Sequence, residues 1–438
     1  MKLDLARNAC IQILYRIEKE GAYSNIVLDE YIQNNRSKLN DKDINLISEI
    51  VYGTISWKLT IDYIIQKYSK IKINKISPWI INILRIGVYQ IIFLDKIPKS
   101  AAVNECVNLT KKYGVKSTGF VNAILRKVDK QDYEKINELH LKYSMPLWLI
   151  DELKKDYDIK TVEQICINTN LKPKTTIRVN KLKTTKQDLK EKLKEKGIEY
   201  EETSEDDFLN IKIKNLSNLD LFNDGYFTVQ DISAGMPVKI LDAKEGEIVL
   251  DMCSAPGGKT TYLAEMMKNK GTIYACDLHK QRLNLVEENA KRLGINIIKT
   301  MQCDATVLND GFIEKFDKIL LDVPCLGMGV LKRKPDIKWQ RREEDIKEIS
   351  EIQLKILQTC SKYLKKDGEL VYSTCSILKE ENENVISKFL KQSNFEIKVE
   401  EKGNTKTNMI YSILPSKEQD GFFICKLKNK NEFSTILQ

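Results

Sequence analysis

Two of the ten cysteines stand in polar turns, in the segments Asp322-Val-Pro-Cys325 and Tyr372-Ser-Thr-Cys375. Each turn follows an apolar run that is typical of a buried strand. Backbone N–H groups and nearby lysines in such turns can lower the pKa of a thiol and give a nucleophilic thiolate. We therefore expect Cys325 and Cys375 to take part in chemistry, whereas burial is the role expected of the cysteines on predicted helices: Cys10, Cys106, Cys166 and Cys360.

A glycine-containing segment, residues 251–260, reads Asp-Met-Cys-Ser-Ala-Pro-Gly-Gly-Lys-Thr and leads from a predicted strand into a predicted helix. Paired glycines let a ligand approach the backbone, and the helix start offers free N–H groups. A phosphate-binding P-loop is excluded because Cys253 stands five residues before Gly258, where that motif has glycine. The dinucleotide motif G-x-G-x-x-G is absent too. A nucleoside ligand without a polyphosphate, such as S-adenosylmethionine (AdoMet), fits this segment.

Four predicted strands each end in an aspartate: Asp251, Asp277, Asp304 and Asp322. Ligands of open α/β sheets bind at the carboxyl ends of the strands. Asp277 follows Asp251 by 26 residues, about where an acid binds the ribose hydroxyls in nucleotide-binding sheets. One strand-end aspartate could equally cap a helix, but four in consecutive strands indicate a nucleoside-type cofactor.

A thiolate beside AdoMet suggests methylation of a pyrimidine at C5, a carbon that is a poor nucleophile unaided. Addition of a thiolate to C6 activates C5 for attack on the methyl group. An acid at the N3 edge, for which Asp322 is well placed, would stabilise the adduct, and a base must then remove the C5 proton. Methyltransferases of exocyclic amines typically carry an Asn/Asp-Pro-Pro-aromatic motif, whereas this chain has Asp-Val-Pro-Cys.

Three segments of different character must position these residues. Residues 1–135 predict helices at 5–20, 43–57, 77–93, 101–113 and 119–128, with Asp41 and Ser77 as N-caps and Gly21 as a helix stop. Residues 140–228 predict a small α+β module with strands at 175–179, 198–201 and 208–213 and a helix at 185–196. From residue 229 to 438, strands at 247–251, 272–277, 297–304, 318–322 and 369–373 alternate with helices at 258–268, 279–293 and 344–364. That alternation predicts a doubly wound, Rossmann-like parallel sheet, completed by strands near 396–400 and 421–428 that could be antiparallel.

Composition limits the partners and the compartment. Lys and Arg outnumber Asp and Glu by 71 to 62 overall and by 22 to 15 within residues 1–140, which fits a polyanionic partner and evenly solvated charge equally well. Scattered cysteines without a CxxC pair, and a start without a signal peptide, predict a reduced, cytoplasmic chain. The apolar stretch 79–94 contains Arg85 and predicts a buried helix, not a membrane span. Cys276 and His279 have zinc-like spacing but no second pair, so we expect no metal.

The sequence resembles the Sun/Nop family of RNA cytosine-C5 methyltransferases. The matching motifs are Gln230-Asp-Ile-Ser-Ala, residues 251–260, Asp277, Asp304, Asp322-Val-Pro-Cys325 and Ser373-Thr-Cys375-Ser376. The resemblance implies a C-terminal class I AdoMet-dependent methyltransferase domain, a small RRM-like module that includes Thr176-Ile-Arg-Val-Asn180, and an N-terminal NusB-like helical RNA-binding domain. It therefore covers nearly the whole chain.

The resemblance also implies a role for each site residue. Cys375 would be the nucleophile and Cys325 would assist product release, with Asp322 as the third catalytic residue. The Pro-Cys motif alone would point the other way, because DNA cytosine methyltransferases use that cysteine as the nucleophile. The implied AdoMet contacts are Cys253, Ser254, Ala255, Pro256, Gly257, Gly258, Lys259, Asp277, Asp304 and Asp322.

We therefore expect a monomeric enzyme that methylates C5 of a cytosine in 16S rRNA, cytosine 967 in the family's naming. One alternative is the same reaction on tRNA or large-subunit rRNA. The other is a non-catalytic, NusB-like RNA-binding or antitermination factor, against which the intact Cys375, Cys325 and Asp322 argue.

A basic segment follows the Asp-Val-Pro-Cys motif. Lys332, Arg333, Lys334 and Lys338 stand close to Trp339. Such a group can hold phosphates while the indole stacks on a base. The other interpretation is a solvated basic helix start with Trp339 in the core. Since the site must admit a polynucleotide, the sequence favours contact with RNA.

Overall fold

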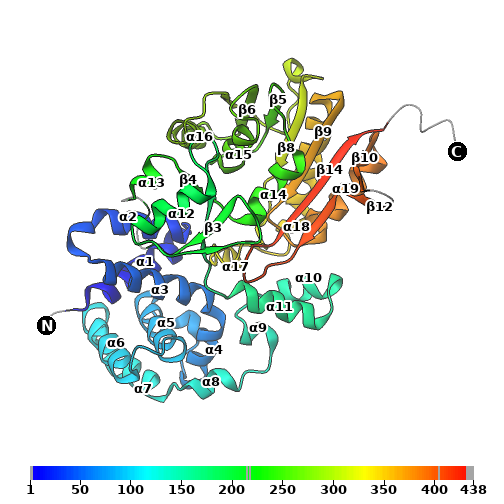
Figure 1. Ribbon diagram of the computed structural model, residues 1–438. Helices are drawn as coiled ribbons and strands as arrows, with labels where there is room; N and C mark the ends of the chain where they lie inside the picture. Colours follow the sequence, from blue (N-terminus) through cyan, green and yellow to red (C-terminus); the bar gives the residue numbers. More distant parts are fainter. Residues whose placement is uncertain (1–2, 214–215, 217–218, 403–404, 431–438) are drawn as a thin grey trace. The chain divides into compact units, whose positions relative to one another are not determined.

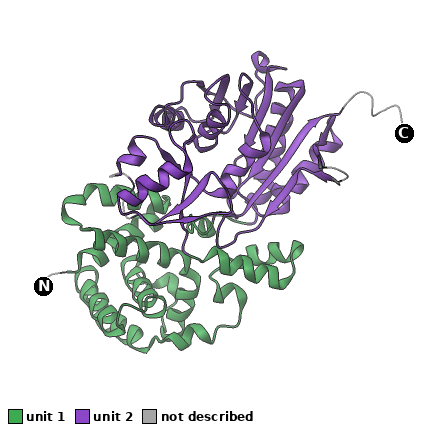
Figure 2. Ribbon diagram, viewed as in Figure 1, with its two compact units in different colours: residues 1–171, 331–342 green, residues 172–330, 343–438 purple. Residues whose placement is uncertain are grey.

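The computed structural model describes residues 3–213, 216, 219–402 and 405–430 (Figure 1). The chain divides into two compact units (Figure 2). Unit 1 comprises residues 1–171 and 331–342, and unit 2 comprises residues 172–330 and 343–438. The short segment 331–342 therefore belongs to unit 1, although the residues before and after it in the sequence belong to unit 2.

Unit 1 is built from helices. The first, α1, begins after the N-cap Asp4 and ends at Gly21, whose φ of +63° is the left-handed conformation expected of a helix stop. The helices of unit 1 are α1 (Leu5–Glu20), α2 (Ser24–Asn34), α3 (Asp41–Ser56), α4 (Lys58–Tyr68), α5 (Pro78–Phe93), α6 (Lys99–Tyr113), α7 (Thr118–Lys127), α8 (Lys130–Glu134), α9 (Leu139–Lys142), α10 (Leu147–Asp156), α11 (Ile159–Thr169) and α17 (Ile337–Gln340).

The central helix of unit 1 is α5, and its side chains from Ile80 to Ile92 are buried. Its one basic residue, Arg85, is paired with Asp62 at 2.7 Å and with Glu18 at 2.8 Å, which allows a cation in the interior. The prediction of a buried helix here is confirmed. Among the described residues, no helix is both long enough and apolar enough to cross a membrane.

The predicted helices of unit 1 are found, with two differences. Asn40, and not Asp41, caps α3, because its side chain accepts from the N–H groups of Lys42 and Asp43. The helices α2, α4, α8, α9, α10, α11 and α17 were not predicted. None of these seven helices is longer than 11 residues.

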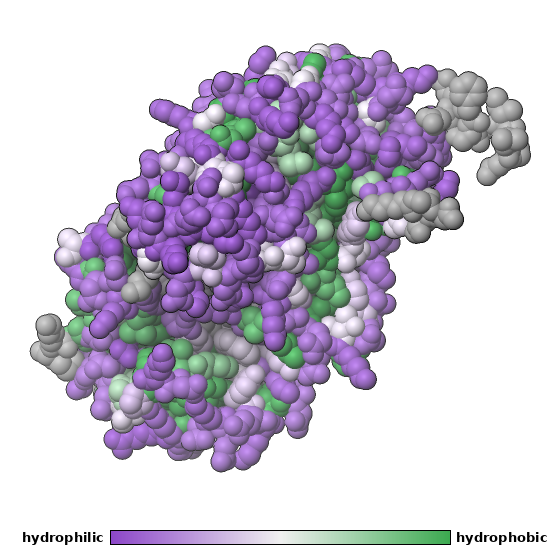
Figure 3. All heavy atoms as spheres, in the orientation of Figure 1, coloured by the Kyte–Doolittle hydropathy of each residue, from purple (hydrophilic) through white to green (hydrophobic). Residues whose placement is uncertain are grey.

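Apolar side chains are concentrated in the interior of each unit, and hydrophilic side chains are concentrated on the surface. The apolar side chains of each unit are gathered in its cores. On the face shown in Figure 3, hydrophilic residues cover most of the surface, with apolar residues in limited patches. Charged residues, 30% of the chain, therefore remain mostly solvated.

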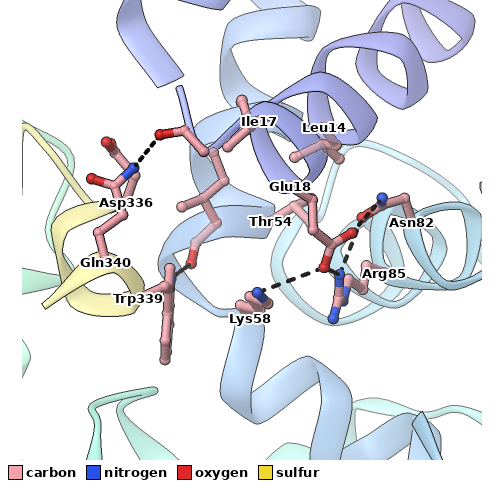
Figure 4. A pocket seen from close by; sticks show the side chains of 12 residues that line it. Leu14, Ile17, Glu18, Thr54, Lys58, Asn82, Arg85, Asp336, Trp339 and Gln340 are labelled. Atoms are coloured by element: carbon pink, nitrogen blue, oxygen red, sulfur yellow. Dashed lines mark hydrogen bonds and ion pairs between the residues drawn. The ribbon is translucent and has the colours of Figure 1, made fainter. Parts of the chain in front are cut away.

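The basic segment 331–342 packs within unit 1, at the carboxyl end of α3. Lys338 is buried, and its ammonium lies 2.8 Å from Asn170 Oδ1 and 3.3 Å from the carbonyl of Ser56. The indole N–H of Trp339 donates to the carbonyl of Ile55 at 2.8 Å (Figure 4). The expected contact with RNA is therefore wrong for Lys338, because this side chain is buried within unit 1 and its amine donates to the Ser56 carbonyl at the end of α3 and to Asn170.

Trp339 also lines a cavity of about 210 Å³ in unit 1 (Figure 4). Charged side chains that line this cavity are paired with one another. Glu18 accepts a hydrogen bond from Arg85 at 2.8 Å, and its carboxylate lies 3.7 Å from the ammonium of Lys58. Asp336 accepts from the hydroxyl of Ser24 at 2.6 Å. The segment is thus held in unit 1 by polar contacts as well as by packing of Trp339 on the helical core.

Unit 2 begins with a four-stranded antiparallel sheet in the order β2-β3-β1-β4. Its elements are β1 (Thr175–Val179), α12 (Lys186–Glu195), β2 (Tyr200–Glu202), β3 (Phe208–Ile211), α13 (Asp220–Asn223) and β4 (Phe227–Val229). The predicted cap of α12 is present, since the Thr185 side chain accepts from the N–H of Asp188. This is the expected α+β module.

The second sheet of unit 2 has the strand order β10-β14-β9-β8-β5-β6-β7, with β13 paired to β14. The strands β5 to β9 are parallel, and β14 is antiparallel to β9, as the sequence suggested. The elements are α14 (Ile232–Leu241), β5 (Ile248–Asp251), α15 (Gly258–Met266), β6 (Thr272–Asp277), α16 (Lys280–Leu293), β7 (Ile298–Gln302), β8 (Phe316–Asp322), α18 (Asp345–Cys360), β9 (Leu364–Thr374), α19 (Glu383–Lys391), β10 (Phe395–Ile397), β13 (Ile410–Ile413) and β14 (Phe422–Asn429). A separate hairpin is formed by β11 (Val399–Lys402) and β12 (Thr405–Asn408).

The expected fold class is confirmed in all three parts: helical, α+β and Rossmann-like. The two compact units do not test the predicted domain limits at 1–135, 140–228 and 229–438, and these limits remain a prediction.

Burial of Lys338 predicts a pH dependence of the stability of unit 1. Burial lowers the pKa of this lysine to about 7, far below the value of 10.5 of a free lysine. Between these values the unfolded chain binds a proton that the folded chain does not bind, so stability rises with pH, by up to about 1.4 kcal/mol per pH unit. Lys338→Met should remove this slope.

Hydrogen exchange of unit 1 amides between pH 7 and 10, corrected for intrinsic rates, measures the slope of stability against pH in the parent protein and in Lys338→Met. The control is Lys334→Met, which removes an exposed lysine of the same segment and should keep the slope of the parent chain. Equal slopes for the parent chain and Lys338→Met would show that the buried amine does not titrate in this range.

Candidate active site

Strand pairing brings the two turn cysteines together. The strands β8 and β9 are parallel neighbours, and Asp322 is paired in register with Ser373. Cys325 and Cys375 follow these two residues, and their Sγ atoms lie 3.0 Å apart. Both cysteines are half-buried, whereas Cys10, Cys106, Cys166 and Cys360 are buried, as expected.

The contact between the two thiols affects the proton of Cys325. The hydrogen bond to Cys375, with burial as a second cause, raises the pKa of Cys325 well above the usual value for a thiol. Cys325 therefore stays protonated near neutral pH. Either sulfur can be the donor across the 3.0 Å contact, so the choice of Cys375 as the nucleophile stays a prediction.

A lysine and a carboxylate lie next to this thiol pair. Lys259 Nζ is 2.6 Å from Asp322 Oδ2, and Ser373 Oγ donates to Asp322 Oδ1 at 2.9 Å. Burial lowers the pKa of Lys259, but the attraction of Asp322 and of Cys375 outweighs it, so the pKa is raised and the lysine stays charged. Lys259, predicted as a cofactor contact, is thus directed at Asp322.

The segment 251–260 forms a tight loop between β5 and α15. Gly257 has a φ of +99°, and a Cβ there would lie 3.0 Å from Cα of Val286, so both conformation and space require glycine. The loop is fixed by Ser254 N, which donates to the carbonyl of Cys276 at 2.9 Å, and by Asn289, which donates to the carbonyl of Pro256 at 3.1 Å. Ala255 is buried in this loop.

Two buried polar atoms of this loop have no hydrogen-bond partner among the described residues. Asp251 accepts from Thr260 Oγ1 at 2.6 Å, but its other oxygen and the hydroxyl of Ser254 are buried without a partner among the described residues. Burial raises the pKa of Asp251 to about 7. A Cβ on Gly258 would meet only the end of a glutamine side chain, at 3.7 Å. Unpaired buried oxygens in this loop fit the polar groups of a cofactor such as AdoMet.

The other predicted strand-end acids lie at the same edge of the sheet, because β5 to β9 are parallel. Asp277 is buried, accepts from the N–H groups of Ala255 and His279, and lies 3.5 Å from Arg282. Asp304 lies just beyond β7, is exposed and accepts from the N–H and hydroxyl of Thr306. Hydrogen bonds from that threonine lower the pKa of Asp304, so it is ionised. Cys253 is half-buried beside them, and burial raises the pKa of its thiol.

One buried arginine was not predicted as a site residue. Arg178 of β1 is fully buried and binds Glu265 of α15 through two nitrogens, at 2.7 and 3.2 Å. The same guanidinium donates to the carbonyl of Gly258 at 2.8 Å and to Gln230. It therefore ties the α+β module to the start of α15. An arginine between Ile177 and Val179 in a predicted strand is the sequence signal, since a cation there must be paired.

A metal site would require a group of ligand side chains in the part of the chain that the structure describes. No group of three or more His, Cys, Asp or Glu side chains there could hold a metal ion.

The sheet order, the glycine loop after the first parallel strand and the acids at the strand ends define a Rossmann-like methyltransferase domain. The family model described as 16S rRNA methyltransferase RsmB/F matches residues 238–428. Models of the NusB family and of the RsmF/B-like ferredoxin-like domain match residues 4–130 and 145–211. The chain belongs to the RsmB/F methyltransferase family.

Relatives of similar length support this assignment. The probable ribosomal RNA small subunit methyltransferase B of Bacillus subtilis is 36% identical, over 98% of this chain and 100% of that protein. The ribosomal RNA small subunit methyltransferase B of Serratia proteamaculans is 34% identical, over 89% and 91%. Among solved structures, PH0851 has a TM-score of 0.81 at 29% identity, over 98% and 100%; NSun6 from Pyrococcus horikoshii with SFG has 0.59 at 26%, over 65% and 99%.

The Arg178–Glu265 pair gives a prediction for stability. Arg178→Met leaves the Glu265 carboxyl buried without its cation, which should lower the free energy of unfolding of unit 2 by about 3–5 kcal/mol. The double variant Arg178→Met/Glu265→Leu removes both charges and should recover most of that loss. Urea denaturation followed by circular dichroism measures both. If the single and double variants lose equal stability, packing rather than the ion pair accounts for the cost.

Proposed function

We propose that the protein is an AdoMet-dependent methyltransferase that acts on C5 of a cytosine in 16S rRNA through a covalent intermediate. The observation that carries the proposal is the 3.0 Å separation of Cys325 and Cys375 Sγ at the ends of two parallel strands, next to Asp322 and Lys259. A methyl transfer to nitrogen or oxygen needs no thiol pair. Transfer to C5 needs one thiol to activate the ring, and a second group to help release it.

Cys375 acts first in this route. Its thiolate adds to C6 of the cytosine, the π pair of the C5=C6 double bond shifts to C4–C5, and N3 takes up a proton, which leaves C5 as the nucleophilic carbon of an enamine. Lys259 lies close enough to Cys375 for this cysteine to contribute to the raised pKa of the lysine. Asp322, held by Lys259 and Ser373, is positioned to bind the N3 edge of the ring.

Cys325 acts second. After C5 has taken the methyl group, the C5 proton must leave so that the C6–S bond can break and the Cys375 thiolate can depart. Cys325 lies against the sulfur that must leave, and it holds a proton in the resting site. It donates this proton to the departing sulfur of Cys375 as the C6–S bond breaks, and the Cys325 thiolate that results takes up the C5 proton, so that the C5=C6 bond re-forms and both thiols are restored.

AdoMet supplies the methyl group. The residues proposed to hold it are the loop from Cys253 to Lys259, with Asp277, Asp304 and Asp322. Asp277 would bind the ribose hydroxyls, and the unpaired oxygens of Asp251 and Ser254 support a polar ligand in this loop.

The proposal of 16S rRNA as substrate is supported by the relatives, which are named ribosomal RNA small subunit methyltransferases. The NusB-family match at residues 4–130 coincides with the basic N-terminal part of the chain and supports an RNA-binding role there. The same reaction on tRNA or large-subunit rRNA remains the alternative that the substrate test must separate.

Asp277→Ala should weaken AdoMet binding. The ribose hydroxyls lose a charged acceptor, and hydrogen bonds to charged groups contribute roughly 1.5–3 kcal/mol, or about 10- to 150-fold in affinity. Calorimetry with AdoMet measures the change, and RNA affinity should stay within about twofold. Asp310→Ala, which removes an exposed acid away from the strand ends, is the matched control. AdoMet affinity equal to that of the parent chain would contradict the assignment of Asp277.

The two cysteines should fail in different ways. Cys375→Ala removes the nucleophile, so methylation and covalent adduct should both be lost. Cys325→Ala should still attack and transfer methyl, but it should accumulate an RNA–protein adduct whose RNA is already methylated. Denaturing electrophoresis with labelled 16S rRNA and AdoMet detects the adduct, and Cys325→Ala/Cys375→Ala is the control that should not form it.

Three results would change the proposal. A stable adduct in Cys375→Ala, with Cys325→Ala merely inactive, would reverse the two roles. Full activity of both single variants would exclude covalent catalysis. An adduct and 5-methylcytosine formed on tRNA or large-subunit rRNA, but not on 16S rRNA, would keep the chemistry and change the substrate.

A further inference from the structure

A buried carboxylate lies beneath both cysteine turns. Glu381 closes a short 3₁₀ turn, Lys379–Glu381, that precedes α19, and its side chain is fully buried. Glu381 lies outside the sequence motifs that predict the site. A carboxylate is costly to bury, so its contacts indicate what it is there to hold.

Each oxygen of Glu381 binds one of the two turns. Oε2 accepts from the N–H of Leu326, the residue after Cys325, at 2.9 Å. Oε1 accepts from the hydroxyl of Ser376, the residue after Cys375. One side chain therefore bridges the two backbone segments that carry the thiols.

A buried glutamine extends this bridge. Gln353 of α18 is fully buried, and its amide donates both to Glu381 Oε2 at 3.0 Å and to the carbonyl of Pro324 at 2.9 Å. The Cys325 turn is thus held on both sides of the cysteine, through the carbonyl of Pro324 and the N–H of Leu326.

Glu381 is itself fixed to β9. The hydroxyl of Tyr372 donates to the Glu381 carbonyl at 2.6 Å. The next residue, Asn382, accepts from Thr374 Oγ1 at 2.5 Å and donates to the carbonyl of Ser376 at 3.0 Å. The residues on either side of Cys375 are therefore bound to the same short segment as the Cys325 turn.

We propose that Glu381 is a positioning residue that sets the separation of the two thiols, so that Cys325 can act on the adduct formed by Cys375. This inference rests on the proposed covalent function. The contacts link turns and not substrate, so Glu381 acts through the cysteines. Since a misplacement of 1 Å can cost about 100-fold in rate, the clamp matters for catalysis even where the fold survives without it.

The test compares Glu381→Met with the parent chain. Methionine has a similar volume but accepts no hydrogen bond from Leu326 or Ser376. We expect kcat to fall about 10- to 100-fold, with KM for RNA and the Kd of AdoMet within about twofold. We also expect an RNA–protein adduct at steady state in a chain that retains both cysteines, because release is slowed more than attack.

Further variants separate positioning from loss of structure. Glu381→Gln keeps an oxygen for Leu326 N–H and a donor for the Ser376 hydroxyl, so it should recover most of the lost kcat. Glu383→Met is the matched control: Glu383 begins α19 and accepts from Ser412 of β13 at 2.6 Å. It should keep parent kcat without adduct. If Glu381→Met does not fold, Gln353→Leu replaces it and should show a smaller loss of kcat with the same adduct.

The outcomes are distinguishable. Cys325→Ala in the parent chain is run in parallel, and its adduct shows that the covalent route operates. With that adduct present, an unchanged kcat in Glu381→Met, a loss of kcat without adduct, or an equal loss in Glu383→Met overturns the positioning role. Absence of adduct in Cys325→Ala overturns the proposed function, and with it this inference.

Discussion

The register between β8 and β9 is the constraint on which the rest of the site depends. Pairing of Asp322 with Ser373 places the two following turns side by side, and the thiols of Cys325 and Cys375 then meet at 3.0 Å. A slip of one residue would turn every side chain of a strand to the other face of the sheet. Leu320 and Leu321 of β8 pack in two different cores, one on each face of the sheet, so a slip would disturb the close packing of both cores.

Buried polar groups then refine what the register sets. Arg178 joins β1 to the start of α15, and Glu381 joins the turns after β8 and β9. Each is fully buried and makes several hydrogen bonds, which is the condition under which a charged group is tolerated in a protein interior. The loop 251–260 and the thiol pair are thus supported by directional contacts, which apolar packing alone does not provide.

What the sequence predicts well are the features that depend on neighbours along the chain. Alternating strands and helices, the stop of α1 at Gly21 and the cap of α12 at Thr185 are local, and the structure contains each of them. The acids at the strand ends and the two cysteine turns were predicted for the same reason. Their assignment to cofactor and catalysis stays a prediction, because only ligand binding and activity test it.

The sequence predicts poorly the roles of residues whose partners are distant along the chain. Lys338 carries a charge in a basic run, and its position suggested RNA. Its actual partners, Ser56 and Asn170, lie far away along the chain. The roles of Arg178 and Glu381 are not predicted, because these residues act through contacts with Glu265 and Leu326, which lie 87 and 55 positions away in the sequence. A charge pattern shows that a partner is needed, but not whether that partner is solvent, RNA or the protein itself.

The asymmetry of the two cysteines follows from the same closeness that brings them together. Two thiolates 3.0 Å apart would repel each other, so loss of one proton makes loss of the second harder. The hydrogen bond to Cys375 raises the pKa of Cys325, so Cys325 keeps the proton that remains. In the proposed route this arrangement would supply one nucleophile and one proton donor. A route that first adds a thiolate to C6 and later expels it uses both, in that order.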